Sequence, residues 1–216
     1  MTHFKSFIDG NWVSSRPAKT IANTNPANFS DVIGFAHLAT REDARSAVES
    51  AFDAFRNWKK TPPPVRGKII AKAARLMEDR REELAAAITR EEGKTLAEAR
   101  GEVTRAINVV EFCAGESRRL TGETIPSELP ANFAYTIREP HGVVAVITPW
   151  NFPVAIPAWK IAPALVAGNT VVFKPATLTP MTAVLLTEIF YDAGLPAGVL
   201  NLVLGSGSDV GAELLS

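Results

Sequence analysis

The chain has 216 residues, 46% of them hydrophobic, and its 23 basic side chains balance its 23 acidic ones, so the formal net charge is zero. Without a basic excess or a basic block, neither nucleic acid nor an anionic membrane is an expected partner. The amino-terminal residues lack the pattern of a signal peptide, and no stretch reaches the roughly 20 apolar residues of a spanning helix, so we expect a cytoplasmic protein.

A β-hairpin and an amphipathic helix are predicted at the amino-terminal end. The turn pair Asp9-Gly10 separates apolar residues within 7–14 and favours a hairpin that begins a small sheet. Thr40 is a good amino-terminal cap for a helix whose apolar residues recur at three- and four-residue steps. We expect these apolar residues to form the buried face of that helix: Ala44, Val48, Ala51, Phe52, Phe55 and Trp58.

Three further helices follow in the pattern. The prolines at 62–64 suit a loop that leads into a helix start. The next helical pattern ends at Gly93, because glycine readily adopts the left-handed conformation that often follows a helix. The last of the three carries charges on one side and an apolar stripe on the other. The stripe consists of Leu96, Ala99, Val103, Ala106, Ile107, Val110, Cys113 and Ala114.

The carboxyl-terminal part has the pattern of a parallel sheet. From Gly142 onward, three short apolar runs, GVVAVI, TVVF and VLNLV, are separated by helix-length segments around 154–167 and 181–193. Continuous apolar runs are typical of strands buried on both faces, and parallel pairing needs crossovers of this length. The predicted fold class is therefore α/β, with a doubly wound parallel sheet after a helical region. Alternating apolar residues within 124–140 predict one separate strand.

The residues that follow the three apolar runs are the candidates for function, because ligands of open parallel sheets bind beyond the carboxyl ends of the strands. Asn151 stands between Pro149 and Pro153, which restrict the backbone. Its amide could donate to an oxygen that gains negative charge. The alternative, which spacing alone favours, is that Asn151 caps the helix that follows.

Lys174 ends the second apolar run, where an unpaired ammonium group would be costly to bury. A ribose hydroxyl or a phosphate is its natural partner, and a solvated lysine at a strand end is the alternative. After the third run, Gly205, Gly207 and Gly211 give G-x-G-x-x-x-G instead of the dinucleotide fingerprint G-x-G-x-x-G. Those glycines alone therefore indicate only a strand-to-helix turn.

Thiol-based, metal-based, serine-hydrolase and P-loop functions have little support in the sequence. Cys113, the single cysteine, excludes a disulfide framework, and its place in an apolar stripe without a nearby basic cluster favours core packing. His3, His37 and His141 are scattered and show no ligand spacing, so we predict surface or loop histidines and no metal site. The sequence has neither the G-x-S-x-G elbow of serine hydrolases nor a Walker loop.

Taken in order, GVVAVITPWNFP, KIAPALVAGNTVVFKPA and VLNLVLGSGSDVG resemble the amino-terminal half of the aldehyde dehydrogenase superfamily, as does EEGKTLAEARGEV. The stretches GETIPSELP, YTIREPHGVV and AIPAWKIAPAL are most similar to succinate-semialdehyde and α-ketoglutarate-semialdehyde dehydrogenases. The resemblance implies a Rossmann-like cofactor-binding domain whose hairpin and helical part is 1–123 and whose βαβαβ part is 141–216. It also implies that 124–140 is a strand arm joining subunits into dimers or tetramers.

The resemblance assigns roles to individual residues. It implies that Asn151 helps to form the oxyanion hole. It also implies a set of cofactor-binding residues in all three loops. These are Ile147, Thr148, Pro149, Trp150 and Asn151 in the first loop, Lys174, Pro175, Ala176 and Thr177 in the second, and Gly207 and Ser208 in the third. NAD-preferring relatives often carry glutamate at the position of Thr177, where a carboxylate would accept bonds from the ribose and repel a 2′-phosphate. With no acid in 174–180, we expect the cofactor to be NAD or NADP, with NADP tolerated or preferred.

In this family a cysteine thiolate attacks the aldehyde substrate, hydride passes to the nicotinamide, and a glutamate-activated water hydrolyses the thioester. The resemblance implies that this cysteine and glutamate come after Ser216, so we expect the catalytic domain to be absent and the isolated chain to be inactive. Two alternatives remain at this point. One is a stand-alone nucleotide-binding or interaction module, and the other is an unrelated Rossmann oxidoreductase, which would normally carry G-x-G-x-x-G where ITPWNFP stands.

Overall fold

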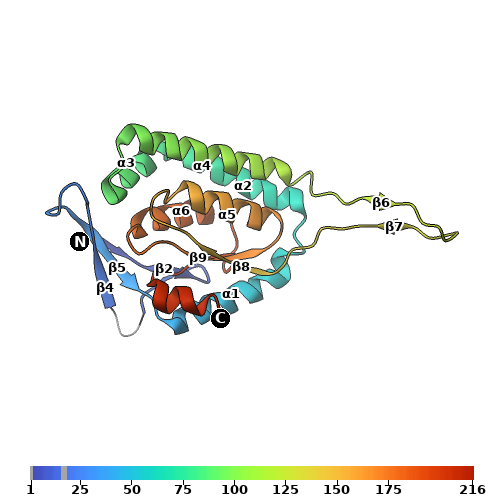
Figure 1. The fold of residues 1–216 in the computed structure, drawn as a ribbon, viewed down its shortest axis with the longest axis horizontal. Coiled ribbons are helices and arrows are strands. Elements are labelled where there is room, and N and C mark those ends of the chain that lie inside the picture. Colours follow the sequence, from blue (N-terminus) through green and yellow to red (C-terminus); the bar gives the residue numbers. More distant parts are fainter. Residues whose placement is uncertain (1, 16–18) are drawn as a thin grey trace.

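A computed structural model describes residues 2–15 and 19–216, which form a layered α/β body with one projecting arm (Figure 1). The strands are β1 (Thr2–Phe4), β2 (Ser6–Ile8), β3 (Asn11–Val13), β4 (Lys19–Thr24), β5 (Val32–Leu38), β6 (Thr124–Ile125), β7 (Ala134–Tyr135), β8 (Val143–Ile147), β9 (Thr170–Lys174) and β10 (Leu200–Leu202). The helices are α1 (Arg41–Trp58), α2 (Pro63–Asp79), α3 (Arg81–Glu92), α4 (Leu96–Glu116), α5 (Ala155–Val166) and α6 (Pro180–Asp192), followed by one π-helical turn, η1 (Gly207–Gly211).

The central sheet has the strand order β3-β2-β10-β9-β8. The three carboxyl-terminal strands pair in parallel, with Leu202 opposite Phe173, as the apolar runs predicted. The predicted hairpin also forms, because Asp9 and Gly10 have φ angles of 50° and 76°, which a tight hairpin turn requires. It does not begin a small sheet of its own, however. Strand β2 pairs antiparallel with β10 and thereby extends the main sheet.

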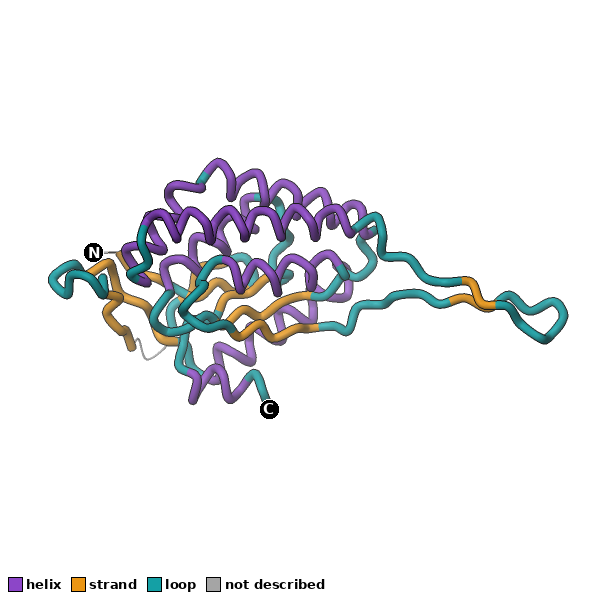
Figure 2. Tube along the Cα trace, turned by 45° about the horizontal axis from the view of Figure 1, so that its top comes forward, coloured by secondary structure: helices purple, strands orange, loops and turns teal. Residues whose placement is uncertain are grey.

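Helices cover both faces of this sheet (Figures 1 and 2). Helix α1 packs along β9 and β10 on one face, α5 and α6 pack on the other, and α2, α3 and α4 form a further layer over α5 and α6. The predicted doubly wound α/β class is confirmed. Strand β9 is buried along its whole length, whereas β8 lies at the edge of the sheet and leaves Ala145 and Ile147 exposed. The expectation that all three strands are buried on both faces is therefore wrong for β8.

The predicted helix boundaries are confirmed at two caps. The hydroxyl of Thr40 accepts a hydrogen bond from Asp43 N at 3.2 Å, and Gly93 ends α3 with a φ of 92°. The buried face of α1 differs from the prediction, since Val48 and Phe52 are 37% and 54% exposed. Ala44 and Ala51 are buried as predicted, and Ala47, which the prediction did not include, completes a row of small residues that faces the sheet and allows close packing. Leu96, at the start of the α4 stripe, is also exposed.

The strands β1, β5 and β4 form a separate sheet that the sequence pattern did not predict. Most residues of β4 are exposed, so this strand lacks an apolar face that could have revealed it. Parallel pairing of β1 with β5 brings Nδ1 of His3 to 3.1 Å from Nε2 of His37. The prediction that the histidines are scattered is therefore wrong for this pair, which only the pairing of the two strands brings together.

Residues 124–140 form the arm that leaves the body in Figures 1 and 2. Only Thr124–Ile125 and Ala134–Tyr135 pair as strands, so the longer strand predicted here is not formed. The side chains of Phe133, Tyr135 and Ile137 are 75%, 61% and 65% exposed. The alternating apolar residues that predicted the strand therefore stay exposed in this chain.

Candidate functional site

The loops 148–153, 175–179 and 203–206 leave the carboxyl ends of the parallel strands β8, β9 and β10, and therefore lie at one end of the sheet. Hydrogen bonds join neighbouring loops. The amide of Thr148 donates to Lys174 O at 3.2 Å, and Oγ1 of Thr177 donates to Gly205 O at 3.2 Å. The strand order thus brings together three segments that are far apart in the sequence.

Three polar groups at this end of the sheet are buried with few partners: the ammonium group of Lys174 and the hydroxyls of Thr148 and Thr179. The side chain of Lys174 is 5% exposed, and its Nζ donates to Pro175 O at 3.0 Å. Burial lowers the pKa of this ammonium group below its ordinary value. Within the described residues, its other two N–H groups have no acceptor, and Oγ1 of Thr148 is buried without a hydrogen-bond partner. Such atoms are uncommon and suit the hydroxyls of a ligand.

The same end of the sheet carries two separate hollows. Trp150, which is 51% exposed, and Thr177 line a cavity of about 330 Å³. A second cavity, of about 500 Å³, is lined by Ser206 and by residues at the start of α1. Gly207 and Ser208 are exposed at the beginning of η1. The two cavities share no lining residue, so the first and third loops border different hollows.

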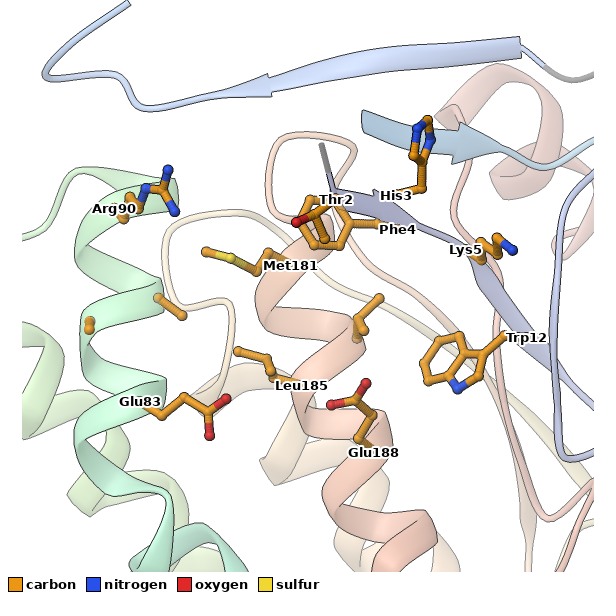
Figure 3. Close-up of a pocket in the computed structure, with 13 residues that line it drawn as sticks. Thr2, His3, Phe4, Lys5, Trp12, Glu83, Arg90, Met181, Leu185 and Glu188 are labelled. Atoms are coloured by element: carbon orange, nitrogen blue, oxygen red, sulfur yellow. The ribbon is translucent and has the colours of Figure 1, made fainter. Parts of the chain in front are cut away.

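A larger cavity, of about 630 Å³, lies between β1, α3 and α6, away from the three loops (Figure 3). Its lining residues are Thr2, His3, Phe4, Lys5, Trp12, Glu83, Ala86, Ala87, Arg90, Met181, Val184, Leu185 and Glu188. Glu83 and Glu188 both pair with Arg80, and Arg90 pairs with Asp31. These charges are thus already matched within the protein, and none of the residues proposed from the sequence for the cofactor lines this cavity.

The loop that carries Asn151 is held by two residues whose supporting role was not predicted from the sequence, Glu102 and Lys94. Glu102 of α4 accepts hydrogen bonds through Oε1 from Val154 N at 2.9 Å and Ala155 N at 3.1 Å, and so caps α5. Nζ of Lys94 donates to Asn151 O at 2.9 Å. The alternative that Asn151 caps this helix is therefore wrong, and the side chain of this exposed residue takes no part in the cap.

A second buried carboxylate caps α6. Glu91, at the end of α3, accepts hydrogen bonds from Met181 N at 2.6 Å and Thr182 N at 2.9 Å, and also from the side chains of Thr182 and Asn23. Burial raises the pKa of Glu91 to about 7, although all four hydrogen bonds favour the ionised form. The amino-terminal amides of α5 and α6 are therefore already bound by carboxylates of the chain itself.

One signal in the sequence could have revealed both carboxylates. Glu91 follows Ile88 by three residues, and Glu102 follows Ala99 by three, so each acid continues the buried face of its helix. An acid in such a position must find donors elsewhere in the fold. The sequence does not say which donors, because Glu102 and Val154 are 52 positions apart.

The chemistry of Cys113 agrees with its predicted place in the core. This thiol is 6% exposed in α4, and burial raises its pKa above the ordinary value. A thiol that is both buried and protonated is a poor nucleophile. Among the described residues, no group of three or more histidine, cysteine, aspartate or glutamate side chains could hold a metal ion, and no helix is long and apolar enough to cross a bilayer.

The fold is that of a doubly wound, Rossmann-like α/β domain with three linked loops at the carboxyl end of its parallel strands. The chain belongs to the aldehyde dehydrogenase family, whose model matches residues 12–216. It is 50% identical over 211 residues to the α-ketoglutaric semialdehyde dehydrogenase of Bacillus subtilis, a match that covers 98% of this chain and 43% of that protein. It is also 46% identical over 202 residues to malonate-semialdehyde dehydrogenase 1 of Geobacillus thermodenitrificans, covering 94% and 42% of the two chains.

Solved structures of longer relatives agree with this fold. An NADP-dependent enzyme of E. coli superposes with a TM-score of 0.96 at 40% identity, covering 99% of this chain and 44% of that one. Betaine aldehyde dehydrogenase of Staphylococcus aureus in complex with NAD⁺ gives a TM-score of 0.94 at 38% identity, covering 97% and 43%. The 216 residues thus span well under half the length of these relatives.

Proposed function

We propose that these residues form the cofactor side of an NAD(P)-dependent aldehyde dehydrogenase that oxidises an aldehyde of the semialdehyde class to a carboxylic acid. The observation that carries the proposal is that Lys174 and Thr148 are buried at the carboxyl end of the parallel strands with hydrogen-bonding groups that lack partners in the described residues. The semialdehyde dehydrogenases to which the chain is similar support the substrate class. The bound dinucleotide would supply the hydride acceptor.

In this proposal the two buried groups hold the cofactor. Lys174, next to Pro175 and Ala176, donates its free N–H groups to ribose hydroxyls, and Thr148 offers its hydroxyl from the neighbouring loop. The remaining assignments follow the family resemblance, with Ile147, Pro149 and Trp150 along the cofactor and Gly207 and Ser208 near the adenine. The unequal exposure of these residues suits such a site, since Trp150 is 51% exposed whereas Lys174 is 5% exposed.

Asn151 has a different role in the proposal. Its side-chain amide donates to the substrate oxygen as negative charge develops on it, and such a donor contributes roughly 2.7–4 kcal/mol in acyl-transfer chemistry. Because Glu102 caps α5, the amide of Asn151 is not committed to that helix. Its carbonyl is held by Lys94, which limits the motion of the backbone that carries the amide.

Dinucleotide binding tests the proposal directly. We expect NAD and NADP to quench the tryptophan fluorescence of the 216-residue polypeptide in a saturable way. Lys174→Met should weaken the affinity for both cofactors about tenfold, because hydrogen bonds from a buried donor are lost. Lys160→Met, at an exposed position of α5, is the matched control and should leave the affinity unchanged. Equal affinities for the wild type and Lys174→Met would exclude the assigned role of Lys174.

The choice between NAD and NADP depends, in the proposal, on Thr177. A glutamate at this position would repel a 2′-phosphate and accept hydrogen bonds from a ribose diol. We expect Thr177→Glu to lower the affinity for NADP at least tenfold relative to NAD, as measured by fluorescence titration. Thr177→Gln has a similar size without the charge and should retain NADP binding. A wild type that strongly prefers NAD would contradict the proposed tolerance of NADP.

The 216-residue polypeptide itself should not turn over substrate. Cys113 is buried and far along α4 from the three loops, and no other thiol is present to attack an aldehyde. Mixing the purified polypeptide with a semialdehyde and NAD(P) should therefore give no increase in absorbance at the wavelength of the reduced cofactor. Turnover that persists in Cys113→Ala would contradict the thiol-based mechanism for this chain.

The arm supports a proposal about assembly. Its apolar side chains Phe133, Tyr135 and Ile137 are exposed, and the arm that carries them projects from the body (Figure 1). We assign residues 124–140 to the joining of subunits in a homo-oligomer, and residues 1–123 and 141–216 to the two parts of one cofactor-binding domain. Pairing of β2 with β10 supports the union of those two parts in one sheet.

A further inference from the structure

The strongest unexplained feature lies where α3 leads into α4. Lys94 follows Gly93 in this connection, and its side chain is 12% exposed. Its Nζ lies 2.6 Å from Oε2 of Glu102, whose side chain is fully buried, and donates to Asn151 O at 2.9 Å. The same ammonium group lies 4.0 Å from the centre of the Phe152 ring. One lysine thus contacts both residues at the centre of the first loop.

The second carboxylate oxygen of Glu102 holds the loop at a further point, where the loop leads into α5. Oε1 accepts hydrogen bonds from Val154 N and Ala155 N at 2.9 and 3.1 Å. The loop is consequently fixed at Asn151 by Lys94 and, three residues later, by Glu102. Proline residues at 149 and 153 restrict the φ angles between and before these points. The backbone from which the side chain of Asn151 extends is therefore held in place.

The energetics argue that this pair does more than stabilise the fold. A buried ion pair is often no more stabilising than apolar side chains of the same volume, because both charges must lose their water. Its hydrogen bonds, however, are directional and hold their acceptors in a defined geometry. The hydrogen bonds that cap α5 all come from Glu102, whereas the ammonium group of Lys94, besides pairing with Glu102, also binds the carbonyl of Asn151.

We propose that Lys94 is a positioning residue, which acts with Glu102 to fix the direction in which the amide of Asn151 points. The inference rests on the role proposed for Asn151 as a donor to the substrate oxygen. Lys94 itself does not contact the substrate in this proposal. Its effect passes through the Asn151 carbonyl and the Phe152 ring, so that the amide is already oriented before a substrate binds, as an oxyanion donor requires.

A double variant separates this role from simple destabilisation. In Lys94→Met/Glu102→Gln both charges of this pair are removed together, so Glu102 is not left as a buried carboxylate without its counterion, and the glutamine oxygen can still accept from Val154 N and Ala155 N. The bond to Asn151 O is lost. Glu102→Gln alone is the matched control, because it keeps the ammonium group of Lys94 that donates to Asn151 O, with Glu92 at 3.8 Å as its remaining acid partner. All variants are made in the 216-residue chain and compared at equal temperature and pH.

The measurement is ¹⁵N relaxation of the side-chain NH₂ group of Asn151, assigned from the signal that disappears in Asn151→Asp. We expect an ordered amide in the wild type and in Glu102→Gln. In the double variant the order parameter should fall below about 0.6, the range of flexible groups. The backbone amides of Val154 and Ala155 should keep their protection from hydrogen exchange in all three proteins.

Two results would overturn the inference. One is an Asn151 amide that stays as ordered in the double variant as in the wild type. The other is a double variant in which Val154 and Ala155 lose protection together with Asn151, since the pair would then have only a structural role. Failure of the proposed function is seen separately, as a wild-type chain that binds no dinucleotide while its Asn151 amide is ordered.

Discussion

Replacing Glu102 with alanine should lower the free energy of unfolding by about 3–5 kcal/mol. The change removes the partner of the Lys94 ammonium group, which would stay in a largely buried place with Glu92 as its nearest acid at 3.8 Å. It also leaves Val154 N and Ala155 N without their acceptor at the start of α5. Unpaired buried donors cost about 1–3 kcal/mol each.

Urea unfolding measures this effect as a lower midpoint with an unchanged slope. Glu111→Ala is the control, because Glu111 lies on the exposed side of the same helix and makes no hydrogen bond among the described residues. It should change the stability by no more than about 0.5 kcal/mol. A loss below about 1 kcal/mol in Glu102→Ala would mean that water or another acceptor replaces the carboxylate without difficulty.

Glu91 should make the stability of the protein fall as the pH rises from 4.5 towards 7. The unfolded carboxyl ionises near 4.5, whereas burial raises the pKa of the folded group to about 7. Between these values the folded state holds a proton that the unfolded state has lost, so the contribution of Glu91 is complete below 4.5 and declines until the pH passes about 7. The total change is about 3 kcal/mol.

Glu91→Gln isolates this contribution, because glutamine does not titrate. The difference in unfolding free energy between the wild type and Glu91→Gln should shift against the wild type by about 3 kcal/mol between pH 4.5 and 7.5. Glu49→Gln, at an exposed position of α1, should leave the pH profile of the wild type unchanged. A constant difference between the wild type and Glu91→Gln would show that the pKa of Glu91 is the same in the folded and unfolded states, because the four hydrogen bonds then offset the effect of burial.

The features that sequence patterns predicted correctly are those with local physical causes. Continuous apolar runs predicted β8, β9 and β10 because the middle strand of a covered parallel sheet has no polar face, as β9 shows. The cap at Thr40, the left-handed Gly93 and the turn at Asp9 and Gly10 depend on residues within a few positions of one another. Such signals remain readable without knowledge of the tertiary structure.

The features that were missed depend on contacts between distant segments. The hairpin joins the main sheet through Phe7 and Leu202, which are far apart in the chain. Lys94 and Glu102 contact the loop of Asn151 from a different layer of the fold. Spacing alone favoured Asn151 as the helix cap, because a local pattern cannot show that a distant carboxylate has already taken those amides. The candidate site was therefore predictable in its loops but not in the residues that support them.

The arm of residues 124–140 should also unfold locally more easily than the body of the protein. Its two strands pair only with each other, and hydrogen bonds between Glu123 and Thr136 close its base. An isolated two-stranded hairpin is marginally stable in water. Fluctuations that separate the strands of the arm therefore require far less free energy than those that open the body. Proteases will cut the monomeric chain here first, and coverage of the arm by another subunit would remove that vulnerability.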